Sequence, residues 1–238
     1  MKLIGLLGGM SWESSAQYYR LANELVRDRV GGLASARVLL HSVDFAEIER
    51  LQAQGRWDEA GAMLASAASG LEAAGAELLV LCTNTMHKVA PAIEAATTVP
   101  LLHIGDVTGR AVREAGVERV GLLATAYTME QPFLRDRLGE HGLTVLVPDA
   151  DDRALVHRVI YEELCLGVVT ETSRQAYREV IARLVDAGAD GVILGCTEIE
   201  LLIGQDDSPV PVFPTTRLHV EAAVEAALAP PSPDHDLT

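Results

Sequence analysis

The chain has 238 residues, of which 49% are hydrophobic, and its formal net charge at pH 7 is −15. A chain of this length can bury a sizeable core, either in one large domain or in two lobes. Because its negative charge would repel nucleic-acid phosphates and anionic lipid headgroups, we exclude binding to nucleic acid or to a membrane as its main function.

Short apolar runs rich in Val, Ile and Leu alternate along the chain with longer stretches of helical period. The runs predict strands at residues 2–7, 36–43, 77–82, 100–104, 119–124, 143–147, 190–195 and 210–214. The longer stretches predict helices at residues 13–30, 58–74, 129–141, 153–166 and 173–187. Strands with so little polar alternation are typical of parallel sheets covered by helices on both faces, so the sequence predicts an α/β fold with mainly parallel sheets.

Two of these segments resemble each other, AAGAELLVLCTNT from Ala73 and DAGADGVILGCTE from Asp186. When Gly75 is paired with Gly188, Thr83 falls on Cys196. A second similarity links LIGLLGGM at the start of the chain with RVGLLATA in its middle. The repeat predicts two similar three-layer lobes related by a pseudo-twofold axis.

The lobe boundaries are predicted from Pro100 and from the linker GQDDSPVP. We expect residues 1–99 and 208–228 to form the first lobe and residues 100–207 to form the second. The run PTTRLHVEAAVEAAL is expected to return as a helix to the first lobe. The tail, residues 229–238, is Pro-rich and polar and is predicted to be mobile.

The repeat also predicts the position of a site, because ligands of open α/β sheets bind beyond the carboxyl ends of the strands. Thr83 and Cys196 each follow such an end, so we expect them to face each other across a cleft between the lobes. Small and hydroxylated residues accompany the strand ends, namely Gly8, Gly9, Ser11, Asn84, Thr85, Thr125, Thr128 and Thr197. Each is a usual turn or N-cap residue, but together with free helix N–H groups they can hold a carboxylate, which predicts a small carboxylic acid as ligand.

The sequence indicates neither a cofactor nor a metal. Its only lysines, Lys2 and Lys88, lie in no phosphate-binding context, and GLLGGM lacks the spacing of nucleotide-binding loops. The three cysteines are far apart and lack CxxC spacing, which argues against a zinc site or a disulfide scaffold. Free cysteines, the absence of a signal-peptide pattern and the absence of a long apolar run predict a cytoplasmic protein.

Four segments carry a resemblance to a known family: GLLGGMSWESS at residues 5–15, CTNTMH at 82–87, YEELCLG at 161–167 and GCTEI at 195–199. Through them the chain resembles the aspartate/glutamate racemase family of cofactor-independent amino-acid racemases, and in particular its enterobacterial-type branch. The resemblance covers essentially all of the chain except the tail. It implies Rossmann-like lobes, a homodimer, no need for pyridoxal phosphate, and a reaction in which one residue removes the Cα proton and another returns a proton on the opposite face.

Most members of that family use two cysteines, one in a Cys-Asn-Thr motif and one in Gly-Cys-Thr. The second is Cys196 here, but Thr83 stands at the first position. We expect Cys196 to act as a thiolate base at the first turn of a helix, where the helix dipole favours negative charge. In the family that this chain resembles, the second cysteine acts on the L-enantiomer, and an aliphatic hydroxyl is a poor base. The resemblance therefore implies efficient proton abstraction from L-amino acids and weak use of D-amino acids, with Thr83 or a water that it holds returning the proton.

Further residues are assigned by their position around the strand ends. We expect substrate binding by Met10, Ser11, Asn84, Thr85, Thr125, Thr128, Thr197 and Glu198. Four of them, Asn84, Thr85, Thr125 and Thr197, are expected to hold the α-carboxylate. His87 would support Thr83 or simply pack near a helix start, and Glu198 would orient the ammonium group, handle protons or complement a helix dipole.

Cys82 lies one residue out of register with Cys196, so the pleat of the strand is expected to point it into sheet–helix packing. The alternative is a local twist that brings Cys82 into the cleft.

The sequence does not determine which side chain the substrate amino acid carries. Acidic substrates need a positive partner, and in acidic-substrate relatives a lysine follows the YEE stretch, where this chain reads YEELCLG with Cys165. Arg50, Arg56 and Lys88 are more typical of solvated surface charges. Aspartate, glutamate and a broader set of L-amino acids all remain candidates. Two other functions also remain: an isomerase or decarboxylase of small carboxylic acids on the same scaffold, and an amino-acid-binding protein without turnover.

Overall fold

The computed structural model describes residues 1–230 and contains two four-stranded sheets in which every strand pair is parallel. The first sheet has the order β2-β1-β3-β4, with β1 (Ile4–Gly8), β2 (Val38–Ser42), β3 (Leu78–Leu81) and β4 (Leu101–Leu102). The second has the order β6-β5-β7-β8, with β5 (Arg119–Leu123), β6 (Thr144–Leu146), β7 (Gly191–Leu194) and β8 (Val212–Pro214). All eight predicted strands are present, and the predicted two-lobed α/β fold is confirmed.

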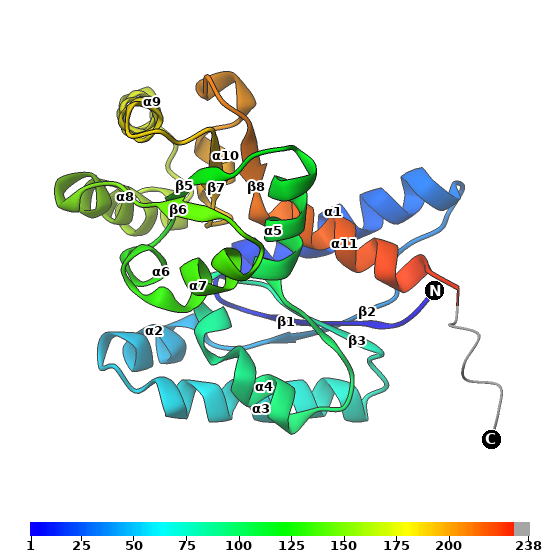
Figure 1. Cartoon of the computed structure of the whole chain (residues 1–238). Coiled ribbons are helices and arrows are strands. Elements are labelled where there is room, and N and C mark those ends of the chain that lie inside the picture. The colour runs from blue at the N-terminus through cyan, green and yellow to red at the C-terminus, as the bar shows by residue number, and fades with distance from the viewer. Residues whose placement is uncertain (231–238) are drawn as a thin grey trace.

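Helices connect the strands and cover both sheets (Figure 1). In the first half of the chain they are α1 (Trp12–Val30), α2 (Phe45–Ala53), α3 (Trp57–Ala73), the 3-10 helix η1 (Thr85–Val89), α4 (Ala90–Ala96) and α5 (Ile104–Glu114). In the second half they are α6 (Ala126–Glu130), α7 (Pro132–Glu140), α8 (Ala150–Glu162), η2 (Leu164–Leu166), α9 (Glu171–Asp186), α10 (Ile199–Leu202), η3 (Gln205–Asp207) and α11 (Thr215–Leu228). None of the helices within residues 1–230 is long and apolar enough to cross a membrane.

The central strands of the first sheet, β1 and β3, are buried throughout because they carry only apolar residues and glycine. Leu7, Leu79 and Leu81 pack with residues of α2, α3 and α4 on one face. Residues such as Leu6 and Val80 pack on the other face with α1 and α11, which lie side by side above the sheet (Figure 1). Each such side chain contributes about 1.5–3 kcal/mol when fully buried. The C-terminal run therefore does return to the first sheet as a helix.

The second lobe repeats this plan around its own core, which contains residues of β5, β7, α8 and α9. Its strand order is that of the first lobe, so β3 and β7 occupy equivalent central places. Both are preceded by a glycine with positive φ, 99° at Gly75 and 96° at Gly188, a backbone conformation that other residues rarely adopt. The aligned positions Thr83 and Cys196 therefore follow equivalent strands.

The strand pairing moves two elements across the expected lobe boundaries. β4 pairs with β3 in the first sheet, although residue 100 was expected to open the second lobe, and β8 pairs with β7 in the second sheet, although residues 208–228 were expected in the first. The chain thus changes lobes after each edge strand rather than before it. We therefore propose a division of the chain into lobes near residues 103 and 215, in place of the expected bounds at residues 100 and 208. Of the predicted tail, residues 231–238 lie outside the described residues.

One predicted helix is interrupted. The stretch 129–141 is divided into the end of α6 and all of α7, because Pro132 has no N–H and is tolerated only at the first turn of a new helix.

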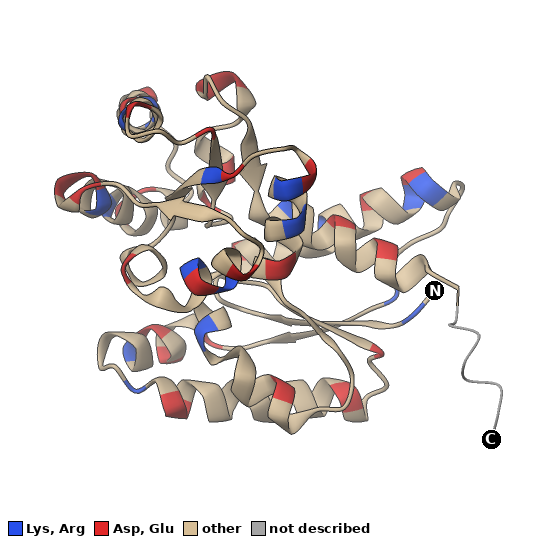
Figure 2. Cartoon of the chain, viewed as in Figure 1, with Lys and Arg blue, Asp and Glu red and all other residues tan. Residues whose placement is uncertain are grey.

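Charged residues gather on the outer faces of the helices, and the middle of both sheets is almost free of them (Figure 2).

Candidate active site

A cavity of about 450 Å³, including the space open at its mouth, lies between the two lobes at the carboxyl ends of β3 and β7. It is lined by Met10, Ser11, Phe45, Gln52, Thr83, Asn84, Thr85, Thr125, Ile160, Tyr161, Cys165, Gly195, Cys196, Thr197 and Glu198. Nine of the expected site residues are among them. Two others, Thr128 and His87, are buried beside the cavity without lining it.

Cys196 is buried, and its thiol donates a hydrogen bond of 2.9 Å to Oε2 of Glu198. Burial, the nearby Glu198 carboxylate and this hydrogen bond raise the pKa of the Cys196 thiol well above its usual range. This direction is opposite to the one expected from the dipole of a following helix. Helix α10 begins only at Ile199 and is four residues long, and the carboxylate two residues after the thiol outweighs it.

Glu198 is held by the opposite lobe. Its Oε1 accepts a hydrogen bond of 2.8 Å from the hydroxyl of Ser11, which also caps α1 by accepting from the Ser14 N–H. The hydroxyl of Ser14 lies 2.7 Å from that of Thr197. These contacts join the start of α1 to the segment after β7, so the thiol and its carboxylate are fixed in one arrangement across the lobe interface.

Thr83 is half-buried, and among the described residues no hydrogen bond to its hydroxyl is found. Its carbonyl lies 2.7 Å from Nδ1 of His87, whose Nε2 accepts from the Ile104 N–H at 3.1 Å. His87 is therefore the neutral tautomer that donates from Nδ1, and burial holds its pKa well below the usual range. His87 thus fixes the backbone of Thr83 and leaves the hydroxyl available to a ligand.

Three hydroxyls meet where the lobes touch. Thr85 from η1 lies 3.1 Å from both Thr125 and Thr128, which belong to the second lobe. Thr125 also caps α6 by accepting from the Thr128 N–H. The cluster offers several O–H donors and no charge, which suits an anion such as a carboxylate.

Asn84 was expected to hold the α-carboxylate, but its hydrogen bonds favour another role. Its Nδ2 donates to the Thr215 hydroxyl at 2.9 Å, and that hydroxyl donates in turn to the carbonyl of Leu194. The Thr215 oxygen must therefore accept from Asn84, which fixes the orientation of the amide. The remaining group, Oδ1, is buried without a partner in the described part of the chain. Because this oxygen is an acceptor, it suits the substrate ammonium group rather than the α-carboxylate.

Cys82 lies on the face of the first sheet that packs against α1 and α11, with no exposed surface. Its sulfur is 3.7 Å from the carbonyl oxygen of Val80, and burial raises the pKa of its thiol strongly. Cys82 does not line the cavity, as the pleat of the strand predicts.

Residue spacing did not identify the residues that line the cavity from helices as site residues. Phe45 and Gln52 come from α2, which no long periodic stretch indicated, and Ile160 and Tyr161 come from α8. Their places follow from how the lobes pack together, which residue spacing alone does not specify.

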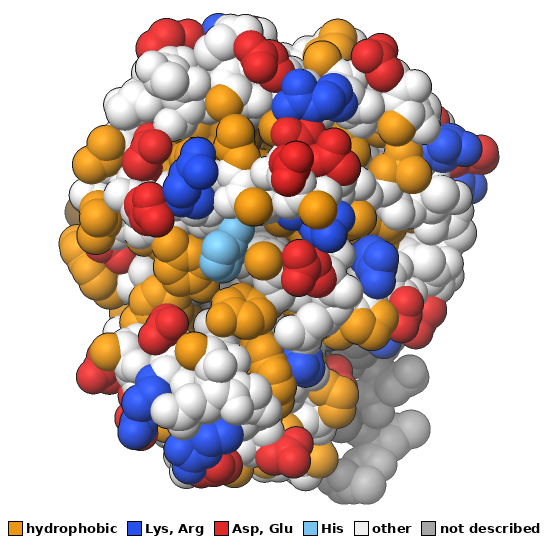
Figure 3. All heavy atoms as spheres, turned by 90° about the vertical axis from the view of Figure 1, so that its left-hand side faces the viewer, with side chains coloured by type: hydrophobic (Ala, Val, Ile, Leu, Met, Phe, Trp, Pro, Cys, Tyr) orange, Lys and Arg blue, Asp and Glu red, His pale blue; other side chains and the backbone are white. Residues whose placement is uncertain are grey.

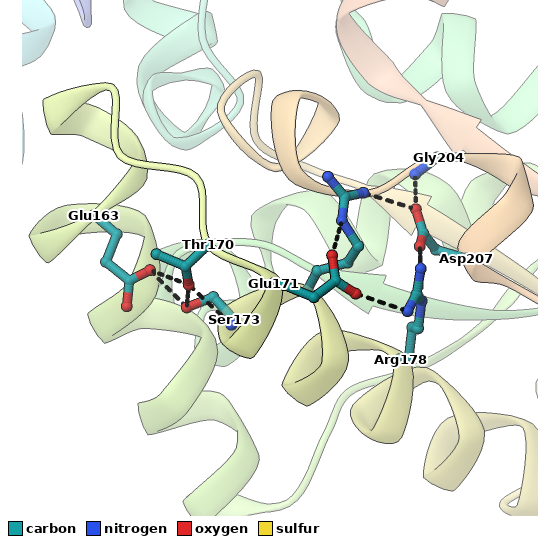
Figure 4. Close-up of polar contacts among 8 residues, drawn as sticks. Glu163, Thr170, Glu171, Ser173, Arg178, Gly204 and Asp207 are labelled. Atoms are coloured by element: carbon teal, nitrogen blue, oxygen red, sulfur yellow. Dashed lines mark hydrogen bonds and ion pairs between the residues drawn. The ribbon is translucent and has the colours of Figure 1, made fainter.

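The segment that carries Cys165 is anchored by polar contacts at the start of α9 (Figure 4). The Ser173 hydroxyl donates to Oε2 of Glu163 at 2.5 Å, and Thr170 caps α9 by accepting from the Ser173 N–H. Nearby, Arg178 bridges Glu171 and Asp207, and Asp207 also accepts from the Gly204 N–H at 2.9 Å. The segments after α8 and after α10 are thereby tied to the same helix.

Comparisons with known proteins give a consistent result. The family model for Asp/Glu/hydantoin racemases matches residues 7–223. A solved structure from Yersinia pestis, assigned as an Asp/Glu racemase, is 55% identical, with a TM-score of 0.91 over 96% of this chain and 100% of that one. An aspartate racemase homologue from Pyrococcus horikoshii is 34% identical, with a TM-score of 0.84 over 95% of this chain and 99% of that one.

A glutamate racemase from Roseiflexus sp. (strain RS-1) is 34% identical over 156 residues, which cover 62% of this chain and 54% of that protein. The family match spans both lobes and includes the segments that follow β3 and β7. The chain therefore belongs to the Asp/Glu/hydantoin racemase family and is an amino-acid racemase.

Proposed function

We propose that this racemase inverts L-amino acids at Cα without a cofactor, with Cys196 on one side of the substrate and Thr83 on the other. The observation that carries this proposal is that these two residues follow equivalent strands of the two lobes and line one cavity. A planar carbanion held between them can lose its proton to one face and regain a proton from the other.

The proposed first step starts from a protonated thiol, which is not itself a base. The Glu198 carboxylate, 2.9 Å from Sγ, takes the thiol proton while the sulfur takes the proton from Cα. The electron pair of the broken C–H bond stays on Cα and is delocalised into the α-carboxylate. Hydroxyls of Thr85 and Thr125 stabilise the carboxylate as its charge increases, and Oδ1 of Asn84 accepts from the ammonium group.

The second step returns a proton to the opposite face, from the Thr83 hydroxyl or from a water that it holds. An unperturbed hydroxyl is a much weaker acid than a thiol and is hardly ionised near neutral pH, so this step is proposed to be slower than the first. Deuterium from the solvent would then enter an L-substrate faster than its configuration inverts.

Pyridoxal phosphate has no part in this proposal. Lys88, the lysine nearest the site in sequence, lies 3.9 Å over the ring of Trp57 and does not line the cavity. We further propose a cytoplasmic location, which agrees with all three cysteines being free.

The function is tested by incubating the protein with a panel of single L-amino acids and separating the products by chiral chromatography. The expected result is the D-enantiomer of at least one substrate, with no other product. Loss of carbon dioxide would indicate a decarboxylase of small carboxylic acids, and tight binding with unchanged handedness would indicate a binding protein. Either outcome would refute the proposal.

We also propose that the protein is a homodimer. Several large apolar side chains within three residues of a cavity residue are exposed, including Trp12, Leu166 and Leu201, which are 68%, 72% and 48% exposed. Hydrophobic side chains also gather around a histidine on the face formed by α2, α6 and α8 (Figure 3). Sedimentation velocity is expected to give twice the chain mass of 25.4 kDa, and a monomer at micromolar concentration would contradict this.

A further inference from the structure

Gln52 is a buried polar residue of the cavity that the proposed reaction does not use. It lies near the end of α2, its side chain is 5% exposed, and it lines the cavity from the first lobe. Neither step of the proton transfer requires an amide at this place. A buried amide is costly unless both of its ends are hydrogen-bonded, so its presence needs an explanation.

The contacts of Gln52 identify which end of the amide is free. Its Nε2 lies 2.8 Å from the sulfur of Met86, and a thioether sulfur carries no proton and can only accept. The nitrogen must therefore face the sulfur, and Oε1 is the other end. Oε1 is buried and has no partner among residues 1–230. The free group is thus a hydrogen-bond acceptor, which needs a donor from a ligand.

The charges around the cavity restrict the ligand further. None of the described lining residues is a lysine or an arginine, and the charged side chain among them is Glu198. A substrate carboxylate beyond Cβ would find no cation there and would meet the lone pairs of Gln52 Oε1. An amide or a hydroxyl at the same place would carry no charge and would supply the missing N–H or O–H.

We propose that Gln52 selects L-amino acids whose side chain is uncharged and ends in a hydrogen-bond donor, an amide or a hydroxyl, over aspartate and glutamate. The proposal rests on the racemase function of the same cavity. Phe45 and Ile160 provide apolar walls for the methylene groups of such a side chain, and the Gln52 oxygen accepts from its end.

The test compares matched pairs of substrates, L-glutamine with L-glutamate and L-asparagine with L-aspartate, with L-methionine as an apolar analogue. We expect kcat/KM of the wild-type protein to favour at least one amide over its acid and over methionine by about tenfold or more. In the Gln52→Leu variant the preference for the amide over methionine is expected to fall by about tenfold. The matched control is Gln54→Leu, an exposed position just after the same helix, which should leave the preference unchanged.

Calorimetric titration with the same five amino acids separates the selectivity from the reaction. Tight binding of the amide without inversion would refute the racemase function and leave the selectivity of Gln52 supported. Equal or stronger binding of the acids than of the amides by the wild-type protein would overturn the selectivity, whether or not the racemase function holds. An equal loss of binding and of kcat/KM for all five substrates in the Gln52→Leu variant would also overturn the selectivity, because a purely structural role of Gln52 would give this result.

Discussion

Replacing Cys196 by serine is expected to lower kcat/KM for L-amino acids by about 10²–10⁴-fold, the range that a positioned acid or base contributes. The serine hydroxyl can still donate to Glu198, so the contact seen at 2.9 Å between the side chains can be kept. The Cα proton would then have to be taken by an alkoxide, which is far harder to form than a thiolate. The measurement is chiral chromatography of initial rates with the best substrate of the panel.

The matched control for this prediction is Cys82→Ser, which places the same substitution outside the cavity. Cys82 is fully buried among apolar side chains, so a hydroxyl there is expected to lower the free energy of unfolding by about 1–3 kcal/mol. The activity of the folded protein should stay close to that of the wild type. If Cys82→Ser abolished the reaction while Cys196→Ser did not, Cys82 rather than Cys196 would have to be the base.

Replacing Thr83 by cysteine is expected to accelerate inversion by about tenfold or more, because a thiol near the cavity can be tuned toward neutrality and a hydroxyl cannot. Since two enantiomers have the same free energy in water, kcat/KM for inversion must be equal in both directions, so the gain applies to L and D alike. The second thiol would also abstract the Cα proton from D-amino acids directly. The expected signature is therefore a large rise in solvent deuterium entering the D-enantiomer.

Thr83→Ser is the control for that variant, because it keeps a hydroxyl at the same position. It should exchange the D-enantiomer as slowly as the wild-type protein does. A rise in D-exchange in Thr83→Ser equal to that in Thr83→Cys would show that space, rather than the acidity of a thiol, limits the second step.

The fold could be predicted from the sequence because burial on both faces leaves the central strands almost entirely apolar. All eight runs became strands, and the repeat around Gly75 and Gly188 placed β3 and β7 in equivalent positions. The same register brought Thr83 and Cys196 to one cavity. The boundaries were less accurate, because β4 and β8 are short edge strands whose sheet is decided by pairing rather than by composition.

Features that depend on contacts between side chains far apart in the sequence could not be predicted. The contact from Ser11 to Glu198 joins residues far apart in the sequence, and it fixes the carboxylate that raises the pKa of the Cys196 thiol. The orientation of the Asn84 amide is set by Thr215, and the free oxygen of Gln52 became visible only when the contact with Met86 was known.

The most direct test of Cys196 as the base that acts on L-amino acids is hydrogen exchange at Cα in D₂O, followed by NMR for each enantiomer separately. Deuterium is expected to enter the L-enantiomer much faster than the D-enantiomer, and Cys196→Ser is expected to remove the fast exchange. Equal exchange rates from both enantiomers, or exchange of the L-enantiomer at the wild-type rate in Cys196→Ser, would show that Cys196 is not this base.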